Sequence, residues 1–245
     1  MLQRYFFEIA YNGTSFHGWQ RQPNEISVQQ EIETAFTKLN SNCQVSIVGC
    51  GRTDTGVHAK HYIFHVELEE HFNLENIVFK LNRMLPVSIA IYDFWEVGLD
   101  THARFQAISR TYRYFLNFQK DPFKLDTSLH LKKTLDFEVM NEASKRLLGT
   151  KDFTSFSKVN TDTKTNICSI SKAEWVKVDD SNYYFEITAD RFLRNMVRST
   201  VGTLLEVGHG KILPNDIDKI IEAKDRRVAA VSVPAHGLFL WEIKY

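Results

Sequence analysis

The stretch Gly51-Arg52-Thr53-Asp54-Thr55-Gly56 lies between two segments with strand character in the first half of the chain. Residues 45–50 are rich in β-branched side chains, and residues 63–68 form a second segment typical of a strand. The glycines at both ends of the stretch indicate a loop, because glycine permits tight turns and close backbone approach. A cation, two hydroxyls and a carboxylate are therefore expected together on a loop that joins two strands.

Outward from this loop, strands and helices alternate irregularly, which favours an α+β fold over a parallel βαβ arrangement. The first half predicts strands at 4–11 and 88–97 and helices at 27–39 and 73–84. The second half predicts strands at 104–118, 167–178, 183–189 and 237–245, and helices beginning at Asp136 and at 192–207 and 215–223. We predict two similar α/β halves, residues 1–108 and 109–245, whose mostly antiparallel sheets meet at a central cleft.

Composition limits the class of protein. The chain has 245 residues, of which 43% are hydrophobic and 24% charged, a balance typical of soluble proteins with room for two domains. Apolar runs fall short of the ~20 residues of a membrane helix, and the N-terminal segment does not resemble a signal peptide. Three cysteines without a CxxC pattern favour reduced thiols. We therefore expect a cytoplasmic protein without a membrane partner.

Several motifs occur in one order along nearly the whole chain. The segment GRTDTGVHA, residues 51–59, resembles the GRTDAGVHA signature of the TruA family of tRNA pseudouridine synthases. Thr55 stands where that family usually has alanine, beside Asp54. Further similarity lies in residues 11–22 (YNGTSFHGWQRQ), 27–29 (SVQ), 102–105 (HARF), 110–114 (RTYRY), 152–156 (DFTSF), 196–202 (MVRSTVG) and 237–240 (GLFL).

The resemblance implies an isomerase that converts uridine to pseudouridine at positions 38–40 of the tRNA anticodon stem-loop, working as a homodimer. It assigns Asp54 as the catalytic carboxylate. A carboxylate beside C1′ can form a covalent ester or stabilise a cation, as in retaining glycosidases. It can alternatively remove a ribose proton to give a glycal, and the sequence leaves both routes open. No cofactor is expected, because the reaction only redistributes bonds.

The resemblance also assigns substrate-binding residues. Tyr112 corresponds to a tyrosine that stacks on the target base, and its hydroxyl is suited to handling the C5 proton. Arg52, two residues before Asp54, is expected to hold a phosphate or fill the gap left by the flipped base. Arg198 and Leu238 complete the expected substrate-binding set. We further expect Arg198 to form an ion pair with Asp54, because a carboxylate in a water-excluding pocket needs a cationic partner.

Additional RNA contacts are expected at basic and polar side chains. Arg191, Arg194 and Arg198 are spaced at i, i+3 and i+7 and would form one basic stripe on a helix. His17 and Arg21 lie in a glycine-flanked loop and are further candidates. Thirty basic and thirty acidic residues balance, which is unusual for a nucleic-acid binder, so RNA binding would depend on a local basic face.

The sequence raises other functions as alternatives. His58, His61 and His65 suggest a metal site, but on a strand His58 faces the opposite side from the other two, so no metal is expected. An Asp-dependent nucleoside hydrolase would need a second carboxylate near Asp54, and the sequence does not place one there. A synthase for another RNA, or an RNA-binding protein without essential catalysis, would be distinguished by assaying tRNA for the C-glycosidic product.

Overall fold

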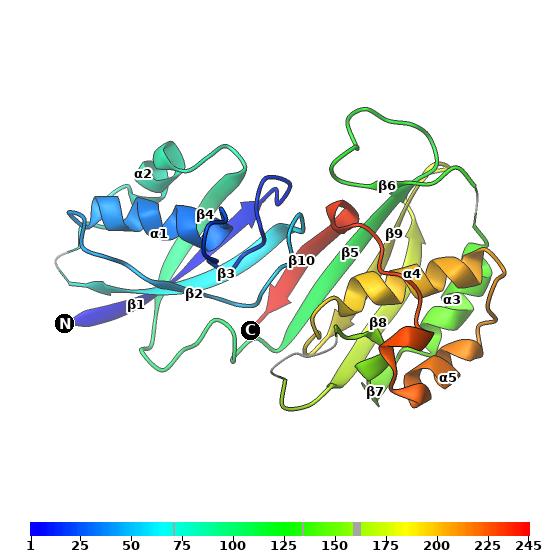
Figure 1. Ribbon diagram of the computed structural model, residues 1–245. Helices are drawn as coiled ribbons and strands as arrows, with labels where there is room; N and C mark the ends of the chain where they lie inside the picture. The colour runs from blue at the N-terminus through cyan, green and yellow to red at the C-terminus, as the bar shows by residue number, and fades with distance from the viewer. Residues whose placement is uncertain (71, 134, 159–162) are drawn as a thin grey trace. The chain divides into compact units, whose positions relative to one another are not determined.

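The computed structural model describes residues 1–70, 72–133, 135–158 and 163–245 of the chain (Figure 1). These residues form two compact units, one of Met1–Ile108 with Leu240–Tyr245 and the other of Ser109–Phe239. Both units combine helices with strands, and nearly all strand pairs are antiparallel, so the predicted α+β class is confirmed. Within the described residues, none of the helices combines the length and apolar character needed to cross a membrane.

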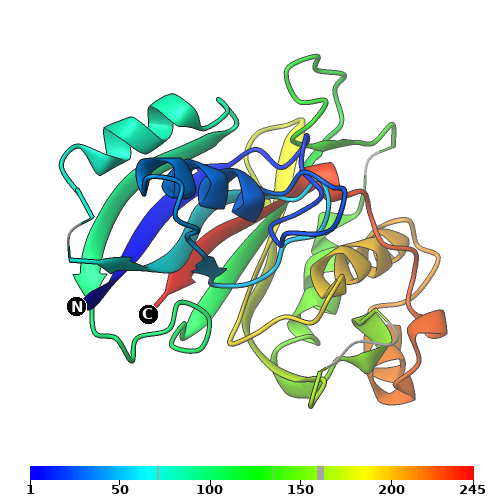
Figure 2. The same ribbon diagram turned by 60° about the vertical axis from the view of Figure 1, so that its left-hand side comes forward.

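The first unit is a sheet with two helices over one face (Figure 2). Its strands are β1 (Leu2–Tyr11), β2 (Ile47–Gly49), β3 (His58–Glu69) and β4 (Ile89–Val97), and its helices are α1 (Val28–Leu39) and α2 (Ile77–Met84). Strand β1 lies between β4 and β3, and β2 pairs with β3. The core centres on Phe7, whose ring lies 5.2 Å from both Phe36 of α1 and Phe64 of β3. Burial of these rings is the main favourable contribution to the unit's stability.

The second unit has a sheet with strand order β5-β9-β8-β7, and helices lie against it (Figure 1). Its strands are β5 (Ser109–Asn117), β6 (Leu129–His130), β7 (Gly149–Asp152), β8 (Ile167–Lys177) and β9 (Asn182–Ala189). Its helices are α3 (Phe137–Lys145), α4 (Met196–Gly208) and α5 (Asp216–Ala223), with short 3₁₀ helices at Thr154–Phe156, Arg226–Val228 and Ala235–Gly237. The strands predicted at 167–178 and 183–189 correspond to β8 and β9, which pair antiparallel.

The last strand, β10 (Leu238–Lys244), corrects the predicted domain boundary. Residues 240–245 belong to the first unit, although the sequence suggested that 109–245 forms one domain. Long-range hydrogen bonds explain the difference, because Ile243 N donates to His61 Nδ1 at 3.1 Å and Tyr245 Oη donates to the Ala103 carbonyl at 2.7 Å. Such pairing between distant segments is invisible to a local reading of the sequence.

Other element boundaries shift by a few residues. Strand β2 is shorter than the predicted 45–50, and β3 begins five residues before the predicted 63–68. Helix α2 begins at Ile77 rather than at residue 73, because Asn76 adopts a left-handed conformation with φ of 54°. The short strands β6 and β7 are absent from the sequence-based prediction. The helix predicted at 27–39 is α1, and it begins as predicted because Ser27 Oγ accepts a hydrogen bond from Gln30 N.

Asp136→Ala is expected to lower the free energy of unfolding by about 1 kcal/mol. The Asp136 carboxylate caps α3 by accepting hydrogen bonds from the backbone N–H groups of Glu138, at 3.1 Å, and Val139, at 3.0 Å. Asn215→Ala is the control, because Asn215 precedes α5 but makes no side-chain capping bond within the described part of the chain. Denaturant titration of both variants measures the difference, and equal losses would contradict the capping role.

Candidate functional site

The Asp54 loop, residues 50–57, connects β2 to β3 and is held at both ends by backbone hydrogen bonds. Cys50 N donates to the Ile63 carbonyl at 2.9 Å, and Gly56 N donates to the Phe16 carbonyl at 3.2 Å. A tight turn forms inside the loop, where Val57 N donates to the Asp54 carbonyl at 3.1 Å. The backbone on both sides of Asp54 is therefore fixed by these contacts.

Thr53 anchors the centre of the loop to the interior of the first unit. Its side chain is only 7% exposed, and its hydroxyl lies 2.8 Å from the hydroxyl of Tyr11. Its carbonyl accepts a hydrogen bond from Trp19 N at 3.3 Å. On either side of this anchor, Arg52 and Thr55 are exposed while Asp54 is half-buried. The predicted loop thus exposes its cation, half-buries its carboxylate and buries Thr53.

Two glycines allow a second loop, residues 12–22, to pack directly on the Asp54 loop. A Cβ at Gly13 would lie 2.0 Å from the Val57 carbonyl oxygen, and one at Gly18 would lie 2.3 Å from the Thr53 carbonyl oxygen. Gly18 also has φ of +82°, a conformation that side-chain-bearing residues rarely adopt. Both positions therefore require glycine, and this supporting contact was not foreseen from the sequence, although the glycines of the 11–22 motif were its visible signal.

Aromatic side chains form the wall behind the loop. The Trp19 and Tyr62 rings stack with centroids 4.1 Å apart, and Tyr11 lies 5.6 Å from Tyr62. The Tyr62 hydroxyl donates a hydrogen bond to the Gly51 carbonyl. Tyr62 is fully buried and Trp19 is 3% exposed, so this wall belongs to the packed interior. Its rigidity limits movement of the backbone that carries Asp54.

The three histidines of β3 accept hydrogen bonds from separate parts of the first unit. His58 Nδ1 accepts from Gly13 N at 3.0 Å, His61 Nδ1 accepts from the β10 backbone, and His65 Nδ1 accepts from Ala103 N at 3.2 Å. Burial, followed by the nearby positive charge of Arg4, lowers the pKa of His65 to about 4. An Nδ1 that accepts from a backbone N–H belongs to the tautomer protonated on Nε2. These rings therefore serve as structural acceptors.

His17 and Arg21, the predicted RNA contacts of the first unit, each have an acidic neighbour. His17 Nδ1 lies 2.9 Å from Glu25 Oε2, and Arg21 Nη1 lies 3.5 Å from Glu33 Oε2. Both side chains remain accessible, with exposed fractions of 46% and 58%. Beside them lies an open hollow of about 410 Å³, lined by Arg21, Gln22, Pro23, Asn24, Glu25, Ile26 and Gln30. Binding a phosphate here would compete with the existing ion pairs.

Tyr112 lies on β5 of the second unit, opposite Ile187 of β9. Its ring is half-buried and meets the Phe192 ring edge to face, with centroids 5.0 Å apart. Two residues further along the strand, Tyr114 is fully buried and donates its hydroxyl hydrogen to the Pro234 carbonyl at 2.9 Å. Burial raises the pKa of Tyr114. The two tyrosines thus differ in environment, and Tyr112 is the one with accessible surface.

Arg198 and Leu238 also lie in the second unit. Arg198 is in the first turn of α4, where its Nε donates to the Val233 carbonyl at 2.7 Å while its own carbonyl accepts from Val233 N. Its positive charge acts on the Tyr114 hydroxyl and opposes the effect of burial there. Leu238 is 5% exposed at the start of β10. The Tyr114 hydroxyl therefore interacts both with the charge of Arg198 and with the Pro234 carbonyl, four residues before Leu238.

The predicted stripe of three arginines on one helix is wrong. Helix α4 begins only at Met196, because Asn195 adopts a left-handed conformation with φ of 65° and donates from its side chain to Ser232 Oγ. Asparagine enters this region more easily than most residues. Arg191 and Arg194 consequently precede the helix, with Arg191 half-buried and Arg194 exposed. Helical spacing therefore does not align them with Arg198.

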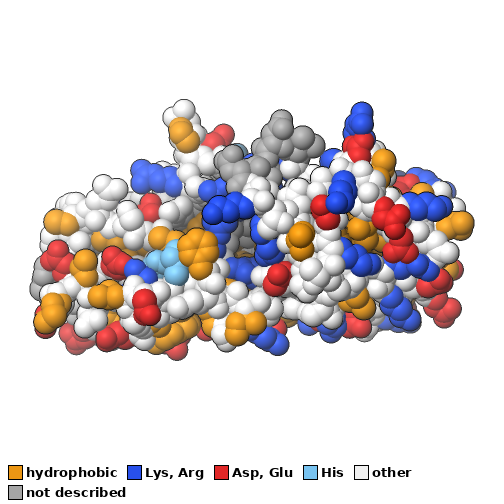
Figure 3. Space-filling view, turned by 90° about the horizontal axis from the view of Figure 1, so that it is seen from below, with side chains coloured by type: hydrophobic (Ala, Val, Ile, Leu, Met, Phe, Trp, Pro, Cys, Tyr) orange, Lys and Arg blue, Asp and Glu red, His pale blue; other side chains and the backbone are white. Residues whose placement is uncertain are grey.

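Charged side chains of both signs are distributed across the surface drawn in Figure 3. This mixture agrees with the equal numbers of basic and acidic residues in the chain. Exposed hydrophobic side chains lie among them singly or in small groups (Figure 3). RNA binding would therefore depend on particular arginine and lysine side chains rather than on a uniformly basic face.

The sequence profile of a family described as tRNA pseudouridine synthase matches residues 9–106 and 143–245. Proteins named tRNA pseudouridine synthase A from Parabacteroides distasonis and Bacteroides fragilis are 51% and 48% identical to this chain, over all of it and over 96% and 97% of their own lengths. A protein of the same name from Listeria monocytogenes is 40% identical over the full length of both chains. This agreement along the entire chain shows that it belongs to the tRNA pseudouridine synthase family.

Proposed function

We propose that the protein isomerises uridine to pseudouridine at positions 38–40 of the tRNA anticodon stem-loop, with Asp54 as nucleophile. Family membership makes the protein an isomerase and supports tRNA as its substrate. The observation that carries the residue assignment is the Asp54 loop. It fixes the backbone on both sides of one half-buried carboxylate.

The reaction needs one carboxylate beside the ribose. The C1′–N1 bond breaks, the uracil turns, a C1′–C5 bond forms, C5 loses its proton and N1 gains one. A carboxylate can attack C1′ to give an ester or remove a ribose proton to give a glycal, and Asp54 is compatible with both routes. In either case the base must leave the stack before the carboxylate can reach the sugar.

Positioning supports catalysis because the reacting atoms must meet at defined distances. The buried Thr53 and the packed loop 12–22 hold the backbone next to Asp54. A carboxylate carried on a fixed backbone has less freedom to lose when the sugar arrives, which lowers the barrier. Thr55 adds an exposed hydroxyl beside Asp54 and is available to tune the rate rather than to change the reaction.

We assign Arg52, Tyr112, Arg198 and Leu238 to substrate binding. Exposed Arg52 supplies a guanidinium suited to a phosphate, and half-buried Tyr112 offers a ring and hydroxyl suited to a base. Arg21, His17, Arg191 and Arg194 are proposed as outer RNA contacts. The homodimer that the resemblance implies stays a prediction, as do the cytoplasmic location expected from the sequence and the absence of a cofactor.

Product mapping on tRNA tests this function. The purified protein is incubated with uridine-labelled transcripts that carry uridine at positions 38, 39 and 40, and C-glycosidic product is located by sequencing after chemical derivatisation. Transcripts without uridine at these positions serve as controls. Product at other positions would replace the proposed specificity by that of a synthase for another site, and binding without product would favour an RNA-binding protein.

Tyr112→Phe is expected to lower kcat while leaving tRNA affinity within about two-fold of the original. Phenylalanine keeps the ring that would stack on the base but lacks the hydroxyl proposed for the C5 proton step. Tyr92→Phe is the control, because Tyr92 is an exposed tyrosine of the first unit. Single-turnover rates and dissociation constants separate the effects, and a parallel loss of binding and rate would indicate a packing role for Tyr112.

A further inference from the structure

Hydrogen bonds to the sheet of the first unit hold the turn formed by residues 98–106. Ala103 is fully buried, and its N–H donates to His65 Nδ1 at 3.2 Å while its carbonyl accepts from Tyr245 Oη at 2.7 Å. The turn closes with a hydrogen bond of 3.1 Å from Gln106 N to the His102 carbonyl. Side chains on the outer side of this turn are therefore held in place by the sheet beneath it.

Phe105 is the most exposed ring on this turn, with 75% of its surface accessible. The His102 ring lies 4.2 Å from it, tilted by 34°, and the Arg104 guanidinium carbon lies 5.8 Å from its centroid. Leaving such a ring in water is unfavourable by the hydrophobic effect. Its two neighbours fix the ring's orientation without covering it.

The two side chains next to Phe105 differ in charge. Burial, followed by the positive charge of Arg4, lowers the pKa of His102, which favours the neutral form of its ring. Arg104 remains cationic and lies within cation–π distance of Phe105. Together these side chains offer one ligand both a stacking face, from the rings of His102 and Phe105, and a positive charge, from Arg104.

We infer that Phe105, with His102 and Arg104, forms a stacking platform for an unpaired base of the tRNA substrate, distinct from the uridine that is isomerised. Unpaired RNA bases are recognised by stacking on exposed aromatic rings and guanidinium planes. A nearby guanidinium also neutralises the adjoining phosphate. The inference rests on the proposed tRNA substrate, and it gives the HARF segment, residues 102–105, a role that the chemistry at Asp54 does not require.

A substitution series at Phe105 distinguishes stacking from packing. Phe105→Ala is expected to raise the dissociation constant for tRNA by about 5- to 150-fold, the range for loss of one base–aromatic stack. Phe105→Leu keeps apolar bulk but should bind as poorly as Phe105→Ala. Phe105→Trp should retain affinity, and its added fluorescence should be quenched by tRNA beyond the change in the unmodified protein.

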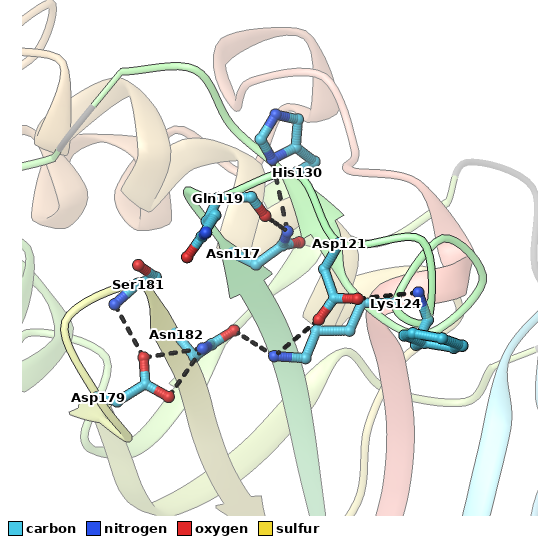
Figure 4. Close-up of polar contacts among 9 residues, drawn as sticks. Asn117, Gln119, Asp121, Lys124, His130, Asp179, Ser181 and Asn182 are labelled. Atoms are coloured by element: carbon cyan, nitrogen blue, oxygen red, sulfur yellow. Dashed lines mark hydrogen bonds and ion pairs between the residues drawn. The ribbon is translucent and has the colours of Figure 1, made fainter.

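Phe123→Ala is the matched control. Phe123 is 92% exposed on the connection between β5 and β6 of the second unit. That connection is held by polar contacts, including Phe123 N to Asp121 Oδ1 at 2.9 Å and Lys124 Nζ to Asn182 Oδ1 at 2.7 Å (Figure 4). Removing the Phe123 ring therefore leaves its loop intact, and tRNA affinity is expected to be unchanged.

Three outcomes would overturn the platform: unchanged affinity in Phe105→Ala, full rescue by Phe105→Leu, or equal losses in Phe105→Ala and Phe123→Ala. Thermal unfolding of each variant verifies that the turn remains folded. Because affinity is measured without turnover, the result is independent of product formation. If the unmodified protein forms pseudouridine but Phe105→Ala binds tRNA with unchanged affinity, only the platform is refuted. If the protein binds tRNA through Phe105 but forms no product, only the proposed function is refuted.

Discussion

Asp54→Asn is expected to reduce pseudouridine formation by at least about 1,000-fold while tRNA still binds with nearly unchanged affinity. The amide has almost the same size as the carboxylate, so the loop should keep its conformation. It is nevertheless a poor nucleophile and a poor base, which removes both the ester and the glycal routes. Single-turnover assays with saturating enzyme measure the chemical step, and filter binding measures affinity.

Asp100→Asn provides the control for this experiment, because Asp100 is an exposed carboxylate in the same unit. Its loss should leave the rate unchanged and should show that one missing negative charge does not by itself alter turnover. Near-normal turnover in Asp54→Asn would remove the nucleophile assignment. A large loss of tRNA affinity in that variant would instead indicate that Asp54 mainly organises the RNA-binding surface.

Local chemistry explains which parts of the fold the sequence predicts well. Ser27 and Asp136 cap helices through hydrogen bonds to backbone groups two or three residues away, so their signals lie within one turn. The glycines around Asp54 likewise indicate a loop without reference to distant residues. Element type is therefore correct where neighbouring residues determine the conformation.

Long-range contacts explain what the sequence does not reveal. The membership of residues 240–245 in the first unit depends on hydrogen bonds with residues 61 and 103, more than a hundred positions away. The delayed start of α4 depends on a left-handed Asn195 held by Ser232. Neither partner is visible in a window of neighbouring residues, and tertiary contacts override local preference at both places.

In the candidate site too, some features could be predicted from the sequence and others could not. Asp54 was identified from a motif, and its loop was predicted from its glycines. The contact between Thr53 and Tyr11, by contrast, joins residues 42 positions apart, and the sequence carries no direct sign of it. The support behind a reactive group is harder to predict than the group itself, because support comes from whatever the fold packs against it.

Gly18→Ala tests that support and is expected to destabilise the first unit by about 2–4 kcal/mol, combining left-handed strain with overpacking. The new Cβ would lie 2.3 Å from the Thr53 carbonyl oxygen and 3.2 Å from the carbonyl carbon of Asp54. The Asp54 loop must move to relieve this contact. Because catalysis depends on sub-ångström positioning, the rate per folded molecule should fall by roughly 100-fold.

Gly210→Ala separates the two causes. Gly210 has a comparable φ of +70°, but among the described residues no atom beyond its own chain neighbours lies within 4 Å of the point that an added Cβ would occupy. This variant therefore carries the backbone strain without the collision, and it should lose about 1 kcal/mol of stability while keeping its rate. Denaturant titration gives both stabilities, and rates are compared well below the unfolding transition. Equal loss of rate in the two variants would show that strain alone matters, whereas loss confined to Gly18→Ala would show that close packing on Thr53 and Asp54 positions the catalytic loop.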